Sequence, residues 1–296
     1  MRKVSAILLS MFAFSFSFSG VADSSLNDEL KKMDQAEKQF QKRLSRLSCA
    51  FMDLETMFPN EDSRALAKAA GKGKIVTVEK LIGSGIDVNT RGTGNCSVLF
   101  WSMRNEQGFK KLLELGANPN IVFDDGGSVM HFSVRHEDSQ FLRATLKYGG
   151  NPNLVAGQMG KTPLFEAVGP SNKNKLNILL NAGANINFQM INGNTPMMVA
   201  AGLGQFDVVL KLLNQGADYT LKNNNGRNLM DIIEWRSKTM DPNNELTHWM
   251  HKVVKWLNKK GIPVNSQTSL SPNNKPKFVR YAHWDASQRG CSAPLG

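Results

Sequence analysis

The chain has 296 residues, of which 41% are hydrophobic and 21% charged, so a packed core is available in one large domain or two small ones. Its formal net charge at pH 7 is +11. No segment after the N-terminal apolar run is apolar enough to cross a bilayer, which excludes a multi-span membrane protein.

Residues 1–22 predict a secretory signal peptide. Arg2 and Lys3 form a short basic region, Val4–Phe18 is an uncharged run, and Gly20–Ala22 supplies small residues for cleavage. The alternative is an uncleaved N-terminal anchor. A lipoprotein would need a cysteine directly after the apolar run, and Cys49 comes far too late. We therefore expect a soluble protein exported to the periplasm.

Export changes the meaning of the positive charge. In a cytosolic protein it would indicate nucleic acid, whereas outside the cytoplasm an acidic protein or an anionic lipid surface is the better class of partner. The basic residues are scattered, with no single stripe and no interleaved aromatic residues. We expect no nucleic-acid partner, and we expect most basic side chains to lie on solvated faces.

Three cysteines, Cys49, Cys96 and Cys291, permit one disulfide in an oxidising compartment and leave one thiol over. Their spacing contains no Cys-x-x-Cys, so neither a metal site nor a redox motif is expected. The sequence leaves open which two of them pair.

Residues 23–60 predict a long amphipathic helix. Apolar side chains recur there at three- and four-residue steps, at Leu26, Leu30, Met33, Phe40, Leu44, Leu47 and Phe51. One interpretation is a cap over the apolar end of the domain that follows, and the other is an arm that binds a partner.

A period near 33 residues runs through the centre of the chain. Glycines that follow leucine-rich segments stand 31, 33, 34 and 33 residues apart, at Gly85, Gly116, Gly149, Gly183 and Gly216. A constant period of this length is typical of a stacked solenoid.

Each unit predicts a helix, a turn and a second helix. Thr162 and Thr195 are expected N-caps followed by proline at the first helical position, and Ser97 and Ser128 offer the cap without proline. The second helix carries leucine pairs and ends at a glycine that accepts a left-handed turn. An extended finger then leads to the next unit.

These units resemble the ankyrin repeat, whose pattern runs G-x-T-P-L-H-x-A with a later L-L-x-x-G-A-D-x-N. The segments GKTPLFEAVGPSNKNKLNILLNAGANIN and GNTPMMVAAGLGQFDVVLKLLNQGADYT match it most closely, and three earlier units are degenerate. The resemblance implies an all-α solenoid of five to six units over residues 61–264, with an insertion in the last unit near residues 238–246. It also places His131 in a slot that hydrogen-bonds neighbouring units.

The stretch Gly160-Lys161-Thr162-Pro163 ends in the triplet that closes a phosphate-binding loop. Such a loop would need glycine where this chain has Val155, and a buried strand before it. Gly193–Pro196 repeats the pattern one unit later without lysine. We interpret the stretch as a turn and a helix cap, and we expect no nucleotide and no other cofactor.

Residues 265–296 are polar and contain proline, which predicts an irregular tail. No pattern in the chain assembles a catalytic site, so we expect a non-enzyme. His248 and His251 are one helical turn apart, but no third ligand is evident, so no metal site is expected.

The resemblance implies that the concave face and the finger tips bind a partner protein. The transferred inner-helix positions are Trp101, Arg104, Phe132, Arg135 and Glu166. The tip positions are Phe123, Asp124, Asp125, Met159, Met190 and Ile191. Exposed apolar groups beside arginine suit a binding hot spot. The alternative is that the apolar tip residues fold inward.

Three functions remain open for such a non-catalytic protein-binding module. The layout resembles periplasmic immunity proteins that bind and occlude type VI secretion toxins, especially phospholipases. The alternatives are a general periplasmic scaffold or stress-protective protein, and a secreted effector that binds a host protein. We expect the free protein to be a monomer without membrane insertion after signal cleavage.

Overall fold

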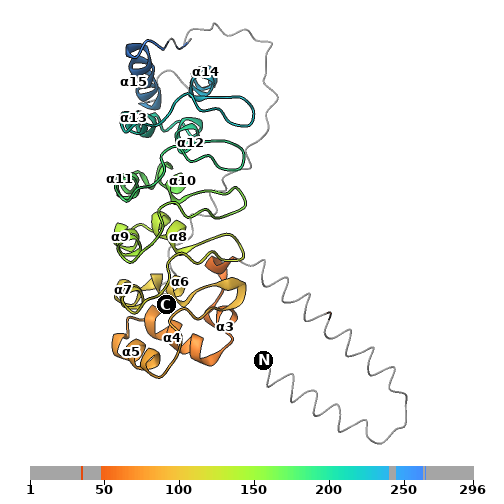
Figure 1. The fold of residues 1–296 in the computed structure, drawn as a ribbon, viewed down its shortest axis with the longest axis vertical. Coiled ribbons are helices and arrows are strands. Elements are labelled where there is room, and N and C mark those ends of the chain that lie inside the picture. Colours follow the sequence, from red (N-terminus) through yellow and green to blue (C-terminus); the bar gives the residue numbers. More distant parts are fainter. Residues whose placement is uncertain (1–34, 36–47, 240–244, 263, 265–296) are drawn as a thin grey trace, which may run out of the picture.

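The computed structural model describes residue 35 and residues 48–239, 245–262 and 264. Over these residues the chain forms a column of six helix pairs with fingers projecting to one side (Figure 1). The inner helices, nearer the fingers, are α4 (Glu61–Gly71), α6 (Val98–Trp101) continued by η3 (Ser102–Arg104), α8 (Val129–Arg135), α10 (Pro163–Ala167), α12 (Pro196–Gly202) and α14 (Leu229–Thr239). The outer helices are α5 (Ile75–Gly83), α7 (Glu106–Glu114), α9 (Ser139–Lys147), α11 (Leu176–Asn181) with η4 (Lys173–Lys175) before it, α13 (Phe206–Asn214) and α15 (Glu245–Lys259).

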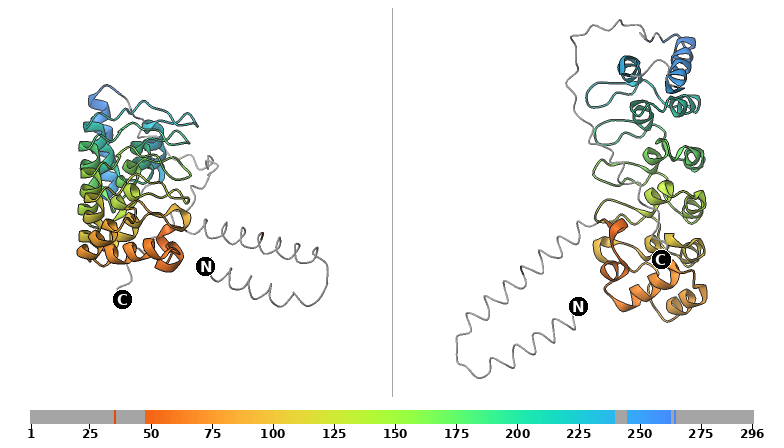
Figure 2. Two further views of the ribbon diagram at one scale, coloured as in Figure 1. Left: turned by 60° about the horizontal axis from the view of Figure 1, so that its bottom comes forward. Right: turned by 180° about the vertical axis from the view of Figure 1, so that it is seen from behind.

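The two rows of helices stay in register along the whole column (Figure 2). Helix α8, for example, packs against its partner α9 and against α10, the equivalent helix of the next unit. This arrangement confirms the predicted all-α solenoid. No described helix is long and apolar enough to cross a membrane.

Side-chain caps start the inner helices. Ser97, Ser128 and Thr195 each accept a hydrogen bond from the backbone N–H three residues further on, as expected. Thr162 has the extended backbone of a cap, but its buried hydroxyl has no partner and does not cap α10. Thr162 therefore occupies the expected cap position, but the expectation that its hydroxyl caps the helix is wrong.

Leucines of the outer helices fill the core between the rows. Leu179, Leu212 and Leu213 are at most 3% exposed and lie in one cluster that extends to the C-terminal unit. Leu180, the second member of its pair, is only half-buried because it lies at the edge of that cluster.

A ladder of asparagine side chains ties successive units together on the surface. Asn120 accepts from the Asn151 N–H at 2.7 Å and donates to the Gly149 carbonyl at 2.9 Å. Asn153 makes the equivalent pair of bonds to Asn185 and Gly183. These bonds satisfy backbone groups at the end of each outer helix, which would otherwise lack partners.

The fingers are short hairpins rather than regular strands, with isolated bridges in three of them. We number each finger by the unit into which it leads. Finger 2 spans residues 91–97, finger 3 residues 122–128, finger 4 residues 155–162, finger 5 residues 189–195 and finger 6 residues 222–228.

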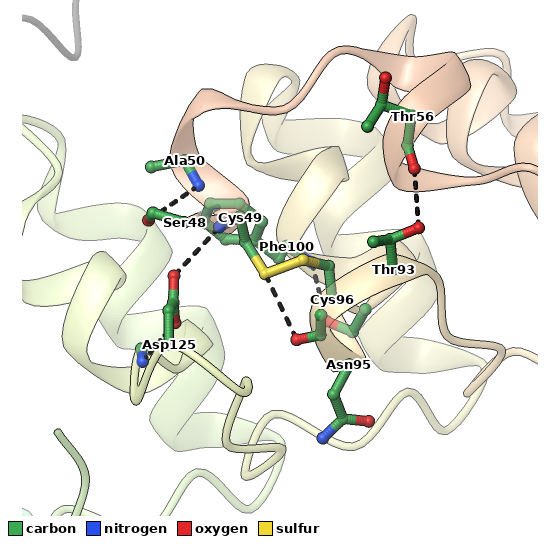
Figure 3. The surroundings of a disulfide bond; sticks show 12 residues. Ser48, Cys49, Ala50, Thr56, Thr93, Asn95, Cys96, Phe100 and Asp125 are labelled. Atoms are coloured by element: carbon green, nitrogen blue, oxygen red, sulfur yellow. Dashed lines mark hydrogen bonds between the residues drawn. A yellow bond between two sulfur atoms is a disulfide. The ribbon is translucent and has the colours of Figure 1, made fainter. Parts of the chain in front are cut away.

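Residues 48–60 form a strap that lies across the first fingers, with η1 (Cys49–Phe51) and α3 (Leu54–Met57) as its short helices. The two are separate because Asp53 caps α3. A disulfide joins Cys49 to Cys96 in finger 2, which settles the pairing that the sequence left open (Figure 3). Cys49 N–H also donates to Asp125 Oδ2 in finger 3 at 3.0 Å.

Several predicted segments lie outside the described residues. They are the signal peptide at 1–22, most of the N-terminal helix within 23–60, and the tail at 265–296, including Cys291. Residues 240–244, inside the predicted insertion, also lie outside. Much of the extra length of the last unit goes into α14 and α15, which are longer than α12 and α13.

The Gly160-Lys161-Thr162-Pro163 stretch forms a hairpin turn and a helix start, as interpreted from sequence. Gly160 adopts φ +60°, and Lys161 pairs with Ala156 across finger 4. A helix of five residues follows, α10, with no strand before it in this part of the described chain.

Candidate protein-binding surface

Two arginine-on-aromatic pairs occupy equivalent positions of adjacent inner helices. The guanidinium carbon of Arg104 lies 3.6 Å from the centroid of the Trp101 ring. The guanidinium carbon of Arg135 lies 4.2 Å from the centroid of the Phe132 ring. Both geometries are those of a cation–π contact.

The helix caps explain why the two pairs repeat. In each unit the aromatic residue stands four positions and the arginine seven positions after the capping serine, Ser97 or Ser128. Residues three apart on a helix lie on one face, so each arginine meets its aromatic ring. The pairs therefore belong to one surface of the column, over α6, η3 and α8.

The rings are fixed and the arginines are exposed. The half-buried Trp101 ring packs edge-on against Phe58 at 6.3 Å, and the half-buried Phe132 ring lies 4.6 Å from Phe100. Arg104 and Arg135 are both exposed. A rigid aromatic base beneath an exposed arginine loses little conformational entropy on binding, as an interface anchor requires.

The position that holds the aromatic ring in these two units holds other residue types further along the column. It is held by Glu166 on α10, then by Val199 on α12 and Ile232 on α14, all half-buried. The inner-helix row thus passes from basic and aromatic to acidic and then to apolar. A partner that fits this row would present complementary groups in the same order along its own surface.

Two of the predicted tip residues do not face outward. Phe123 is 2% exposed, because its ring packs against Phe100 at 5.2 Å, and Met190 is 8% exposed. The Phe123 ring therefore points toward the inner helix α6. The expectation that Phe123 and Met190 are exposed is therefore wrong, and the inward-folding alternative holds for them.

The two acidic tip residues have different roles. Asp124 is exposed. Asp125 is half-buried, and its two carboxylate oxygens accept from the backbone N–H groups of Cys49 and Gly127 (Figure 3). Asp125 therefore anchors the strap to finger 3, and its contact with a partner stays a prediction.

Met159 and Ile191 are exposed as predicted, at 39% and 68%. The sequence analysis missed Val155, which is 48% exposed. A side chain added to Gly160 would lie against both Ile191 and Val155, so the apolar side chains gather around this glycine. Finger 3 also begins with a valine, the half-buried Val122, so the residue type alone did not distinguish the exposed Val155.

The buried titratable groups serve the fold. His131 Nδ1 lies 2.7 Å from Ser128 Oγ, and Nε2 lies 3.1 Å from the Lys161 carbonyl, so the ring bridges two units as the resemblance implied. Burial lowers the pKa of His131. Lys175, 1% exposed, donates to the His136 carbonyl, and burial lowers its pKa as well. Among the described residues no group of three or more potential ligands could hold a metal ion.

The described chain forms an ankyrin-repeat stack, which is a scaffold for protein interaction. Its marks are the paired helices of constant period, the histidine and asparagine hydrogen bonds between units, and the projecting fingers. The family model of ankyrin repeats, in three copies, matches residues 99–190 and 130–223 of this stack.

Three known proteins are similar to this stack in sequence or in fold. Protein PhlB of Serratia liquefaciens is 30% identical over 129 residues, which cover 43% of this chain and only 56% of PhlB. A chain of the solved complex of the Bd0816 predatory endopeptidase from Bdellovibrio bacteriovorus with immunity protein Bd3460 is 25% identical, with a TM-score of 0.54. The match covers 64% of this chain and 98% of that chain. The ankyrin repeat protein EF0377 shares the fold at 24% identity and a TM-score of 0.55, covering 65% of this chain and 99% of EF0377.

Proposed function

We propose that this protein is a periplasmic immunity protein, which binds a secreted antibacterial enzyme and occludes its active-site mouth. The observation that carries the proposal is the pair of arginine-on-aromatic contacts on α6–η3 and α8, at 3.6 and 4.2 Å. Fixed aromatic rings under exposed arginines are the residue types that dominate protein interfaces. The likeness to a chain of an endopeptidase–immunity protein complex supports the same class of function.

The mechanism is steric and electrostatic. The rings of Trp101 and Phe132 are held by the core, so the face needs little rearrangement when a partner docks. Arg104 and Arg135 would pair with carboxylates at the rim of the enzyme's active site. Occupation of that rim would keep the substrate out.

The test is protection of a sensitive bacterial strain. Candidate toxins, a phospholipase effector and an endopeptidase, are exported to the periplasm with and without the full chain. The proposal predicts that the chain prevents killing by one enzyme and copurifies with it in a stable complex. If the chain copurifies with an enzyme but does not reduce killing by any such enzyme, the immunity function is contradicted.

A further inference from the structure

Exposed apolar side chains gather on fingers 4 and 5. Val155 and Met159 of finger 4 are exposed, and Ile191 of finger 5 is exposed to 68%. A side chain added to Gly160 would lie 3.2 Å from Ile191 Cγ1 and 3.7 Å from Val155 Cγ1, so both side chains flank the same glycine. The Ile191 N–H donates to the Met159 carbonyl at 3.1 Å. Val155, Met159 and Ile191 therefore form one patch, which we call the finger patch.

The finger patch is a concentration of apolar surface, not a set of scattered residues. Three of the six large apolar side chains that are exposed in the described chain belong to it, and a fourth, Phe51, lies in the strap. Single apolar side chains on a surface are ordinary, whereas a cluster indicates a contact surface. We therefore expect a further polypeptide segment to cover the finger patch.

The N-terminal part of the chain joins the described structure close to the finger patch. The strap begins at Ser48, and the Cys49 N–H donates to Asp125 Oδ2 of finger 3 at 3.0 Å. The backbones of fingers 3 and 4 are in contact, because a side chain added to Gly126 would lie 2.6 Å from Gly157 Cα. The segment that precedes Ser48 therefore starts one finger away from the finger patch.

The direction of the strap also favours this side of the molecule. Its first residues are fixed to fingers 2 and 3, and its helix α3 packs against α4 and finger 2. In Figure 1 the strap descends to α3 and α4 at the foot of the column. A segment that continues the line of the strap backward from Ser48 would reach fingers 4 and 5. A cap over the first unit would require the chain to reverse its direction at Ser48.

The sequence before the strap carries the apolar stripe that such a contact needs. Apolar residues recur there at helical spacing and lead into the exposed Phe51; the last three are Phe40, Leu44 and Leu47. A helix from Leu26 to Leu47 would be about 33 Å long at about 1.5 Å per residue. Neighbouring helices pack about 8–10 Å apart, so fingers 3 and 5 are separated by about 20 Å. The segment is therefore long enough to cover fingers 4 and 5.

The charges of the two surfaces are complementary. The last part of the segment carries Lys42, Arg43 and Arg46. Asp124 of finger 3 is exposed, and none of the ion pairs within the described chain involves it. Opposite charges beside the first turn of contact would fix the register of the segment on the fingers.

We propose that the amphipathic segment at residues 26–47 of the same chain covers the finger patch, with its apolar stripe against Val155, Met159 and Ile191. The segment thus packs along fingers 4 and 5 instead of capping the first unit or extending freely as an arm. The inference goes beyond the proposed immunity function and does not depend on any partner. It leaves the arginine-on-aromatic pairs of the inner helices as the open binding face of the free protein.

The test is paramagnetic broadening of NMR amide signals in the full chain without its signal peptide. A nitroxide is attached at Gln35→Cys in a Cys291→Ser background, which keeps the Cys49–Cys96 disulfide. Gln35 is exposed, and in a helix it would lie about 20 Å from Ser48, at the level of finger 5. The proposal predicts broadening at residues 155–160 and 189–193 and unchanged signals in α5. Broadening in α5, as for a cap, or in neither region, as for a free arm, would overturn it.

Two variants and one control test the apolar contact in the spin-labelled chain. Ile191→Asp on the finger and Leu44→Asp in the segment should each abolish the broadening at fingers 4 and 5, with an unchanged circular dichroism spectrum. Val76→Asp, at an apolar side chain that is 79% exposed on α5, should leave the broadening unchanged. Broadening that survives both test variants, or that Val76→Asp removes equally, would contradict the proposed contact.

A mixing experiment distinguishes the chain's own segment from a second copy. Spin-labelled chain without isotope enrichment is mixed with enriched chain that carries no label. The proposal predicts no broadening of the enriched chain, because each segment covers its own fingers. Broadening at residues 155–160 and 189–193 in the mixture would assign the finger patch to a second copy and overturn the proposal.

Discussion

His131 shows how one buried side chain holds two repeats together. Its ring accepts from the Ser128 hydroxyl at Nδ1 and donates to the Lys161 carbonyl from Nε2, since a carbonyl can only accept. Both bonds are satisfied by the neutral ring. Burial opposes a charge at this position and lowers the pKa of His131 below its ordinary value of 6.5.

This lowered pKa predicts that stability falls on mild acidification. As the pH falls below 6.5, His131 is protonated in the unfolded chain before it is protonated in the folded chain. The stability that the neutral ring contributes is therefore complete above pH 6.5 and is lost as the pH falls through the folded pKa. Urea midpoints measured from pH 8 to pH 5 should decrease. In His131→Asn the decrease should be smaller, with a remainder from His136, whose pKa burial also lowers. An equal slope in both proteins would contradict this assignment.

Burial separates two leucines that look alike in the sequence. Leu213→Ala should destabilise the protein by about 2–5 kcal/mol, because a 3% exposed side chain leaves a cavity when it is removed. Leu180→Ala should cost clearly less, because Leu180 is half-buried. Chemical denaturation monitored by circular dichroism measures both, and a larger loss for Leu180→Ala would show that the packing of this region is misassigned.

At the scale of elements, the strap is held by covalent and polar links to different fingers. The disulfide to Cys96 fixes it to finger 2, and Asp125 fixes it to finger 3 (Figure 3). Thr93 Oγ1 of finger 2 adds a hydrogen bond to the Thr56 carbonyl at 2.8 Å. The strap thereby covers the N-terminal end of the finger row.

Removal of the disulfide should lower stability substantially. Cys49 and Cys96 are 47 residues apart, and a loop of that size corresponds to about 4 kcal/mol in the chain-entropy account. Cys49→Ser should therefore lower the denaturation midpoint, and a reducing agent should do the same to the wild-type protein. Cys291→Ser is the matched control and should change neither the denaturation midpoint nor its response to the reducing agent. A wild-type midpoint that is insensitive to reduction would contradict this role of the bond.

Local signals predicted the repeat elements well, because period, caps and terminal glycines act within one unit. Side-chain direction in the fingers was harder to predict, since Met190 and Ile191 are neighbours in finger 5 yet Met190 is buried and Ile191 is exposed. The partner of Cys49 depends on how the strap crosses finger 2, a contact between distant segments.

At the scale of the whole molecule, the proposed immunity function requires export. The first 22 residues predict a mature protein that begins at or near Asp23 and is released from the periplasm by osmotic shock. N-terminal sequencing of the released protein checks this expectation. Recovery of the protein only in membranes, with Met1 retained, would contradict it.

The inner helices, which carry the two arginine-on-aromatic pairs, and the outer helices form two separate rows of the column (Figure 2). A variant that alters only the proposed binding side is Arg104→Glu with Arg135→Glu, which retains both aromatic rings. The matched control is Arg143→Glu with Lys147→Glu, on the outer helix α9, where both side chains are exposed.

The most direct test of the central claim is the affinity of these two double variants for the enzyme that the chain neutralises, measured by calorimetry on proteins with wild-type circular dichroism. The inner-helix variant should bind at least about a hundredfold more weakly, since anchor losses of roughly 2 kcal/mol each are ordinary. The outer-helix control should bind like the wild-type protein. Undiminished affinity of a folded Arg104→Glu/Arg135→Glu variant would contradict the assignment of this face as the binding surface.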